Sequence, residues 1–160
     1  MGVIESVGTK LFIYDVTPVD KKGEPNYESQ LTGLDASDNF QSIGEVIDAG
    51  EHTKEYNEVS YVDLKEGRTV KMKGSYNDGG RTIQLAYSKD DDGQKLLREA
   101  LEKRKRYSFK IEYPSEEGSV SEKDYFTAYV MSISKTVGGA DGYLTMSVTL
   151  ALDEGVVTVP

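Results

Sequence analysis

The fold is decided by the stretch Asp90-Asp-Asp-Gly-Gln-Lys-Leu-Leu-Arg-Glu-Ala-Leu-Glu-Lys-Arg-Lys-Arg106, because it is helical in pattern whereas the sequence around it has the patterns of strands. Its apolar side chains recur with the period of an α-helix, about 3.6 residues, and most other positions are charged. We expect the apolar stripe to pack against the rest of the domain. The stripe consists of Leu96, Leu97, Ala100 and Leu101.

Both ends of this predicted helix carry recognisable signals. Asp91 is the predicted N-cap, and Gln94 follows it at the spacing of a capping box. At the other end, the cations from Lys103 to Arg106 would lie beside the last carbonyl groups of the helix, where the helix dipole favours positive charge. Tyr107 then opens a pattern with period two, so the helix should not extend much further.

Strand patterns lie on both sides of the helix. Alternating apolar side chains predict strands over residues 81–88, 107–113 and 124–134, and the clearest strand covers residues 143–152. In that last strand one face is apolar and the other is small and polar, as expected for a wall that faces water. The polar face consists of Thr145, Ser147 and Thr149. Shorter strands are predicted over residues 10–16, 40–49, 69–73 and 156–159.

Three other segments lack this regularity. We expect residues 1–9 to form an N-terminal arm, residues 17–39 a long loop with a possible role between subunits, and residues 51–67 a protruding loop or hairpin. The predicted fold class is therefore mainly β, an antiparallel β-sandwich or barrel with one flanking α-helix. A length of 160 residues favours a single domain, residues 1–160.

Composition excludes several classes of protein. The chain has no Cys, which excludes disulfides and thiolate sites, and it has no apolar run of the roughly 20 residues that a membrane-spanning helix needs. A net charge of −9 argues against attractive binding to nucleic acid, which depends on neutralising phosphates. The acidic balance suits either simple solubility or a surface past which a polyanion slides without sticking.

Catalytic and metal sites find little support in the sequence. The one histidine, His52, lies near Glu51 and Glu55, but nothing predicts the further ligands that a metal ion would need. A single histidine also leaves few candidates for a catalytic triad, and no serine stands in a Gly-x-Ser-x-Gly turn. We therefore expect no catalytic residue, no metal and no cofactor. The eleven tyrosines suit an interface that is wet before assembly and buried after it.

Linked patterns follow one another from about residue 40 to residue 152. The most informative are Ile83-x-Leu85-x-Tyr87, Asp92-Gly93-Gln94-x-x-Leu97, Tyr107-x-Phe109-Lys110-Ile111-x-Tyr113-Pro114 and Phe126-x-Ala128-x-Val130-x-Ser132-Ile133-x-Lys135, closed by the strand from Leu144 to Leu150. In this order they resemble the major tail tube proteins of long, non-contractile-tailed bacteriophages, the lambda-like group. The series covers about two thirds of the chain.

The resemblance implies a structural protein of the virion tail, assembled in the cytoplasm of the host bacterium. It implies sixfold rings of identical subunits that stack into a tube, through which DNA passes into the host without specific binding. Expected partners are further copies of the chain and the tape measure, tail tip and tail terminator proteins, with no membrane. Under this hypothesis Thr145, Ser147 and Thr149 face the lumen, while the N-terminal arm and the segment 51–67 reach the next ring. The candidate contact residues are His52, Lys54, Tyr56, Val59, Tyr61 and Leu64.

Two alternatives remain at this point. A small β-barrel that holds a ligand inside would share the same pattern of strands, but it would need an interior cavity instead of a filled core. An enzyme is the weaker alternative, because no arrangement of catalytic residues is evident.

Overall fold

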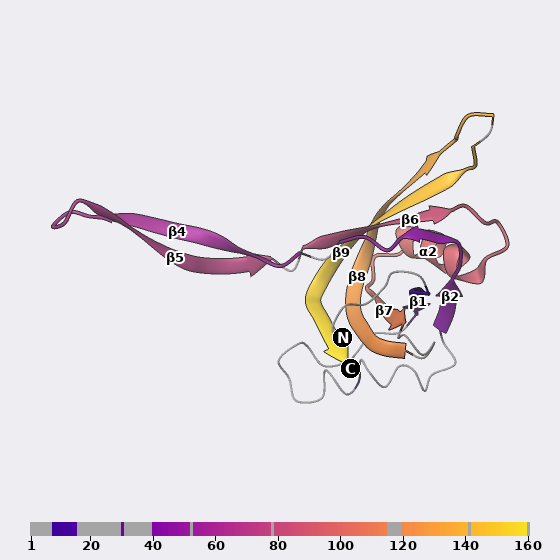
Figure 1. Cartoon of the computed structure of the whole chain (residues 1–160), viewed down its shortest axis with the longest axis horizontal. Coiled ribbons are helices and arrows are strands. Elements are labelled where there is room, and N and C mark those ends of the chain that lie inside the picture. Colours follow the sequence, from indigo (N-terminus) through magenta and orange to yellow (C-terminus); the bar gives the residue numbers. More distant parts are fainter. Residues whose placement is uncertain are drawn as a thin grey trace.

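The computed structural model describes residues 8–15, 30, 40–51, 53–77, 79–114, 120–140 and 142–159. Within these ranges the chain forms a seven-stranded antiparallel sheet, a separate two-stranded hairpin and the helix α2 (Figure 1). The elements are β1 (Lys10–Tyr14), β2 (Phe40–Ile43), β3 (Val46–Asp48), β4 (Glu55–Asp63), β5 (Arg68–Asn77), β6 (Gly80–Ala86), α2 (Asp92–Glu102), β7 (Tyr107–Pro114), β8 (Val120–Thr136) and β9 (Thr145–Val159).

The large sheet curls into a nearly closed barrel. Its strand order is β2-β1-β7-β8-β9-β6-β3, so its two edge strands are consecutive in the chain and only Gly44 and Glu45 separate them. The sequence predicted a single strand over residues 40–49. The structure divides it in two, because Glu45 adopts a positive φ of 59° and breaks the extended backbone. The predicted fold class, mainly β with one flanking helix, is confirmed.

A filled core occupies the barrel. Alternate side chains of β6, β7, β8 and β9 point inward and are almost completely buried, and the rings of Phe109 and Phe126 stack with their centroids 5.3 Å apart. Helix α2 contributes Leu97 and Ala100, both fully buried, while Leu96 and Leu101 are partly buried against the same core.

The helix is shorter at its C-terminal end than its charge pattern suggested. It ends at Glu102, and Lys103 is the C-cap in an extended conformation with φ −97° and ψ 145°. No basic residue therefore lies in the last turn, which corrects the predicted position of the four cations. Lys105 instead forms an ion pair with Asp15, the residue that follows β1.

The N-terminal end of α2 is fixed to the barrel by two polar side chains. Asp91 accepts hydrogen bonds from the backbone N–H of Gln94 (2.9 Å) and of Gly44 (3.1 Å). The amide of Gln94 does not return to the N-cap as in a capping box. It accepts from the N–H of Ser88 (2.8 Å) and donates to the carbonyls of Gly44 (3.1 Å) and Ala86 (3.0 Å). Three separate segments are thereby held together by one fully buried side chain.

Replacing Gln94 with Leu should destabilise the domain by about 3 kcal/mol, because one N–H and two carbonyl groups, all half-buried, lose the side chain that binds them. We expect this as a lower denaturation midpoint in urea with an unchanged slope. Glu99→Gln, at an exposed position of the same helix, is the matched control and should change stability by less than about 0.5 kcal/mol. Equal midpoints for the two variants would show that the Gln94 contacts contribute nothing.

A second polar cluster joins three strands of the barrel. Asp124 on β8 accepts hydrogen bonds from the hydroxyls of Tyr113 on β7 and Thr158 on β9, both at 2.7 Å. Burial, together with the hydrogen bond to Asp124, raises the pKa of Tyr113 to about 12, so its hydroxyl remains a donor at all ordinary pH values. Because Thr158 lies near the end of β9, this contact fixes the last part of that strand to its neighbours.

Candidate functional site

The strands β4 and β5 form a hairpin, residues 55–77, that projects away from the barrel and that we call the arm (Figure 1). The two strands pair only with each other. The arm is longer than the segment 51–67 expected from sequence, because residues 68–77 form its second strand. Most of its large apolar side chains are about half exposed, because a two-stranded ribbon has no core of its own in which to bury them.

One face of the arm is apolar. Directly opposed residues of an antiparallel pair lie on the same face, and the register pairs Val59 with Met72 and Tyr61 with Val70. Val59, Tyr61 and Met72 are 47%, 53% and 50% exposed. We call Val59, Tyr61, Val70 and Met72 the apolar face. A contiguous apolar strip of this kind on a projecting ribbon is typical of a surface that another protein covers.

The opposite face carries lysines and tyrosines. Tyr56 and Tyr76 are paired across the strands with ring centroids 5.5 Å apart. The ammonium group of Lys54 lies 4.3 Å from the centroid of the Tyr76 ring, and that of Lys73 lies 4.8 Å from the centroid of the Tyr56 ring. Lys71 is two residues from Lys73 and shares its side of the strand. We call Lys54, Lys71 and Lys73 the cationic face.

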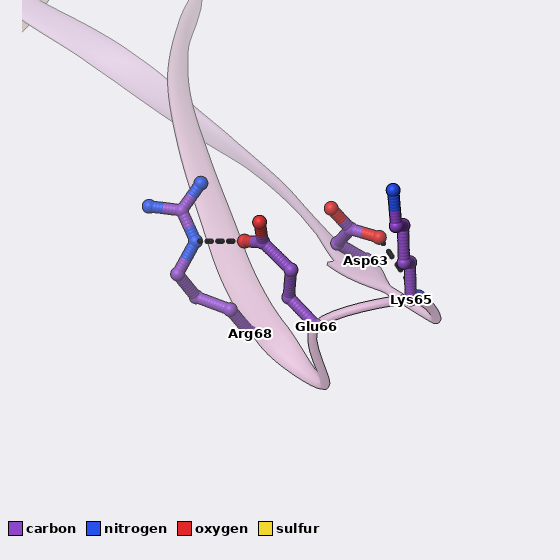
Figure 2. A network of polar contacts seen from close by, with 4 residues as sticks. All are labelled: Asp63, Lys65, Glu66 and Arg68. Carbon is purple, nitrogen blue, oxygen red and sulfur yellow. Dashed lines mark hydrogen bonds and ion pairs between the residues drawn. The ribbon is translucent and has the colours of Figure 1, made fainter.

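The tip of the arm is a tight turn fixed by local contacts (Figure 2). The carboxylate of Asp63 accepts from the N–H of Lys65 (2.9 Å), and Arg68 pairs with Glu66 across 3.3 Å. These local contacts leave Leu64 at the tip, 95% exposed. A leucine exposed in this way contributes nothing to the stability of the monomer. Its position suits a contact made only with another molecule.

Five of the six contact residues expected from sequence lie in or beside the arm, but on different surfaces. Val59 and Tyr61 are on the apolar face, Lys54 and Tyr56 are on the opposite face, and Leu64 is at the tip. The sixth, His52, lies outside the described residues. Sequence reasoning missed the contribution of β5, namely Val70, Met72, Lys71, Lys73 and Tyr76, although the strict alternation of residues 69–73 was the signal for it.

An uncharged wall covers the outer side of β6, β9 and β8. The register aligns three cross-strand rows, in which the core-facing residues alternate with outward-facing ones. The rows are Thr82–Thr149–Ser132, Gln84–Ser147–Ser134 and Ala86–Thr145–Thr136. The three residues expected to face a lumen, Thr145, Ser147 and Thr149, form the middle column of this wall.

None of the nine positions in the uncharged wall carries a charge, although 29% of the chain is charged and charge concentrates on protein surfaces. Such a wall neither binds nor repels a polyanion electrostatically, because it has no cations to retain phosphates and no carboxylates to repel them. The hydroxyl and amide groups remain available to water.

One strand edge beside this wall has no partner among the residues that the structure describes. The pairing of β7 with β8 stops at Ala128, whereas β8 continues to Thr136. The β7 side of residues 129–136 therefore presents backbone N–H and C=O groups to the outside. Exposed edges of this kind pair readily with a strand of another chain.

Nothing in the described part of the chain suggests a metal centre or a membrane segment. Within those ranges no three residues of the types His, Cys, Asp and Glu come together in a way that could hold a metal ion. Similarly, the helix found there is not long and apolar enough to cross a bilayer. The predicted N-terminal arm, apart from Gly8 and Thr9, and the predicted loop 17–39, apart from Gln30, lie outside the described residues.

Several solved structures share this fold. The SPP1 tail tube aligns with 98% of this chain and 78% of its own, at a TM-score of 0.66 and 18% identity. The PVC sheath-tube complex of an extracellular contractile injection system, in its extended state, aligns with 99% of this chain and 92% of its own, at a TM-score of 0.65 and 13% identity. The sheath/tube terminator of the same system aligns with 100% of this chain and 99% of its own, at a TM-score of 0.66 and 13% identity.

Identities this low establish the fold alone, and no curated protein matches the chain. The family assignment comes from the sequence itself. Residues 22–156, most of the chain, match the family described as lambda phage tail tube protein, TTP. This match includes the arm, the uncharged wall and the helix. The chain therefore belongs to the lambda phage tail tube protein family, a structural, non-enzymatic family of the virion tail.

Proposed function

We propose that this protein assembles into hexameric rings that stack into the tail tube of a long, non-contractile phage tail, and that the tube carries DNA into the host during ejection. The observation that carries the proposal is the arm, a ribbon with an exposed apolar face that no part of the described monomer covers. The neighbour that covers it is another copy of the same chain. Assembly takes place in the cytoplasm of the host bacterium.

Within a ring, the free edge of β8 is the natural contact. Strand directions alternate along β3-β6-β9-β8, so β3 runs opposite to β8. A rotation about the ring axis therefore places β3 of one subunit antiparallel to β8 of the next. The same β3–β8 contact is repeated at every interface of the ring. Heterologous contacts of this type close into a ring and remove the exposed edges.

The uncharged wall then lines the bore. A ring closed between β8 and β3 joins the outer faces of β3, β6, β9 and β8 from successive subunits into one continuous surface. Six copies of the nine-residue wall give DNA a polar and hydrated path, beside which β3 adds the carboxylate of Asp48, the cross-strand partner of Gln84. Binding of DNA would slow its passage, so the absence of lysine and arginine from these rows supports transport without specific binding.

The arm and the ends of the tube supply the remaining contacts. The apolar face and Leu64 extend from the barrel toward the adjacent ring, together with Tyr56 and Lys54, and the N-terminal arm and His52 complete this contact in the proposal. The tape measure protein occupies the bore before ejection, and tail tip and tail terminator proteins cap the two ends. Among the related solved structures is a sheath/tube terminator, which supports a terminator contact here.

The alternative of a ligand-binding barrel finds no support in the arrangement of the core. The side chains that would line an internal cavity, among them Phe109, Phe126 and Leu97, are instead packed against each other with no exposure. Most of the exposed large apolar side chains of the described residues are on the arm, and the others lie on β3, on β8 and between β8 and β9.

Because the protein has no cysteine, a single introduced thiol reports directly on the position of the wall. Thr149→Cys places it on the wall, and Glu99→Cys places it on the exposed side of α2. After assembly of the purified protein, we expect electron microscopy to show tubes. A bulky polymer-linked maleimide should then modify Glu99→Cys but not Thr149→Cys, whereas both monomers should react.

A small maleimide, which can enter the bore, is the control and should modify both variants in the tube. Monodisperse monomers that never form rings or tubes, even with a tail initiator, would refute the proposed assembly. Tubes in which the bulky reagent modifies Thr149→Cys as fast as in the monomer would retain the assembly but remove the wall from the bore.

A further inference from the structure

The cationic face of the arm is only partly neutralised within the described part of the molecule. Lys71 forms a long ion pair of 3.9 Å with Glu58, which lies on the same face opposite Lys73, and the side chains of Lys71 and Glu58 are well exposed. Lys54 and Lys73 form no ion pair with any described residue and lie over the rings of Tyr76 and Tyr56 instead. An exposed cation–π contact is worth only about 0.5–1 kcal/mol and leaves the charge intact.

The tyrosines lie on the same side of the ribbon as these lysines. Their rings are paired at the base of the arm, and the ammonium groups of Lys54 and Lys73 lie over them. A contact of this strength favours one position of each ammonium group and so lowers the entropy that the lysine loses when it binds a partner. The arm is therefore prepared on this face for carboxylates.

Charge distribution identifies where those carboxylates come from. The arm together with Lys54 carries five cations and four carboxylates, a net charge of +1. Because the whole chain has a net charge of −9, the remainder of the chain has a net charge of −10. Copies of such a chain repel one another except where an arm meets the acidic remainder of a neighbour. The charge complementarity is thus between two copies of this chain.

We propose that the cationic face of the arm, formed by Lys54, Lys71 and Lys73, binds carboxylates of a second copy, so that tube assembly weakens as the salt concentration rises. This inference rests on the proposed function, because the second copy is a neighbour in the tube. The apolar face and the cationic face then have separate tasks. The apolar face supplies contact area, and the cationic face offsets the repulsion between acidic subunits and selects the orientation of docking.

The test compares two double variants with the same change in net charge. Lys54→Glu with Lys73→Glu reverses the cationic face, and Lys89→Glu with Lys103→Glu reverses two exposed lysines next to α2. The critical concentration for assembly is measured by sedimentation between about 50 mM and about 500 mM NaCl, a range over which screening of exposed charges becomes nearly complete. Circular dichroism and urea unfolding check that both variants are folded.

For the wild type we expect the critical concentration to rise several-fold across this range. Reversal of the cationic face should raise it about tenfold at low salt, equivalent to about 1.4 kcal/mol per docked arm, and should flatten or invert the salt dependence. The control variant should keep the wild-type slope. Lys54→Arg with Lys73→Arg should assemble like the wild type, because it retains both the charge and the contact with the rings.

Each other outcome has a distinct meaning. If the wild type forms no tubes, the proposed function fails. If it forms tubes whose critical concentration does not depend on salt, or if the two charge-reversal variants behave alike, this inference fails and the proposed function stands. Binding of a labelled DNA duplex by the wild-type monomer, lost in Lys54→Glu with Lys73→Glu while assembly is unchanged, would assign the face to nucleic acid and overturn the proposal.

Discussion

Replacing the arm, residues 55–77, with a two-residue Gly-Ser turn is expected to give a folded monomer that no longer forms tubes. The arm can be removed cleanly, because β4 and β5 pair only with each other and contribute none of the buried core residues. Its two ends are also adjacent, since Glu55 pairs with Asn77. The barrel should keep its denaturation midpoint, while the apolar face that joins the subunits is lost.

The extent of this deletion matters. Removing only the segment 51–67 that the sequence suggested would leave β5 without its partner strand, and the unpaired edge would aggregate. Size-exclusion chromatography, urea unfolding and electron microscopy together measure the result. As a control, Glu66→Gln removes the ion pair at the tip and should leave assembly nearly unchanged, because exposed pairs contribute about 0–1 kcal/mol. Tubes of normal length from the armless protein would refute the role of the arm.

The second large effect is expected from Leu97→Asp, which should abolish folding. Leu97 is completely buried in the barrel core. A carboxylate at this position would be desolvated without a partner, and the cavity left by the leucine adds to the cost, so the total exceeds about 5 kcal/mol and equals or surpasses the stability of an ordinary domain.

We expect this variant to be insoluble or to lack a cooperative urea transition. Lys103→Glu is the comparison, because it also introduces a carboxylate into this region but at an exposed position after the end of α2. That variant should fold normally and at most alter assembly. A Leu97→Asp protein with a cooperative transition near that of the wild type would show that the helix is dispensable to the barrel.

The sequence predicts elements well where one local pattern determines them. The stripe containing Leu97 and Ala100 and the alternation in residues 143–152 depend on periodicity alone, and periodicity survives in any surroundings. The contacts of Gln94 do not follow from such a pattern. They involve Gly44, fifty residues away in the chain, and only the folded barrel brings the two together.

The candidate site divides in the same way. The protruding segment and the column of Thr145, Ser147 and Thr149 could be predicted, because exposure and polarity leave traces in one strand. The strand over residues 69–73 could also be predicted, but its pairing with β4 could not, since a clean alternation is compatible with any sheet. The uncharged wall is a property of three strands in register, and that register is fixed by long-range pairing.

The position of β1 has a consequence for the time course of folding. β1 pairs with β7 across about 100 residues of chain, whereas β8 with β9 and β4 with β5 are local hairpins. Closing the long loop is entropically costly, so the hairpins should form first and the barrel should close last, on a slow timescale. A nascent subunit would therefore display its arm before its barrel is complete, and only subunits whose barrel has closed would be competent to join a ring.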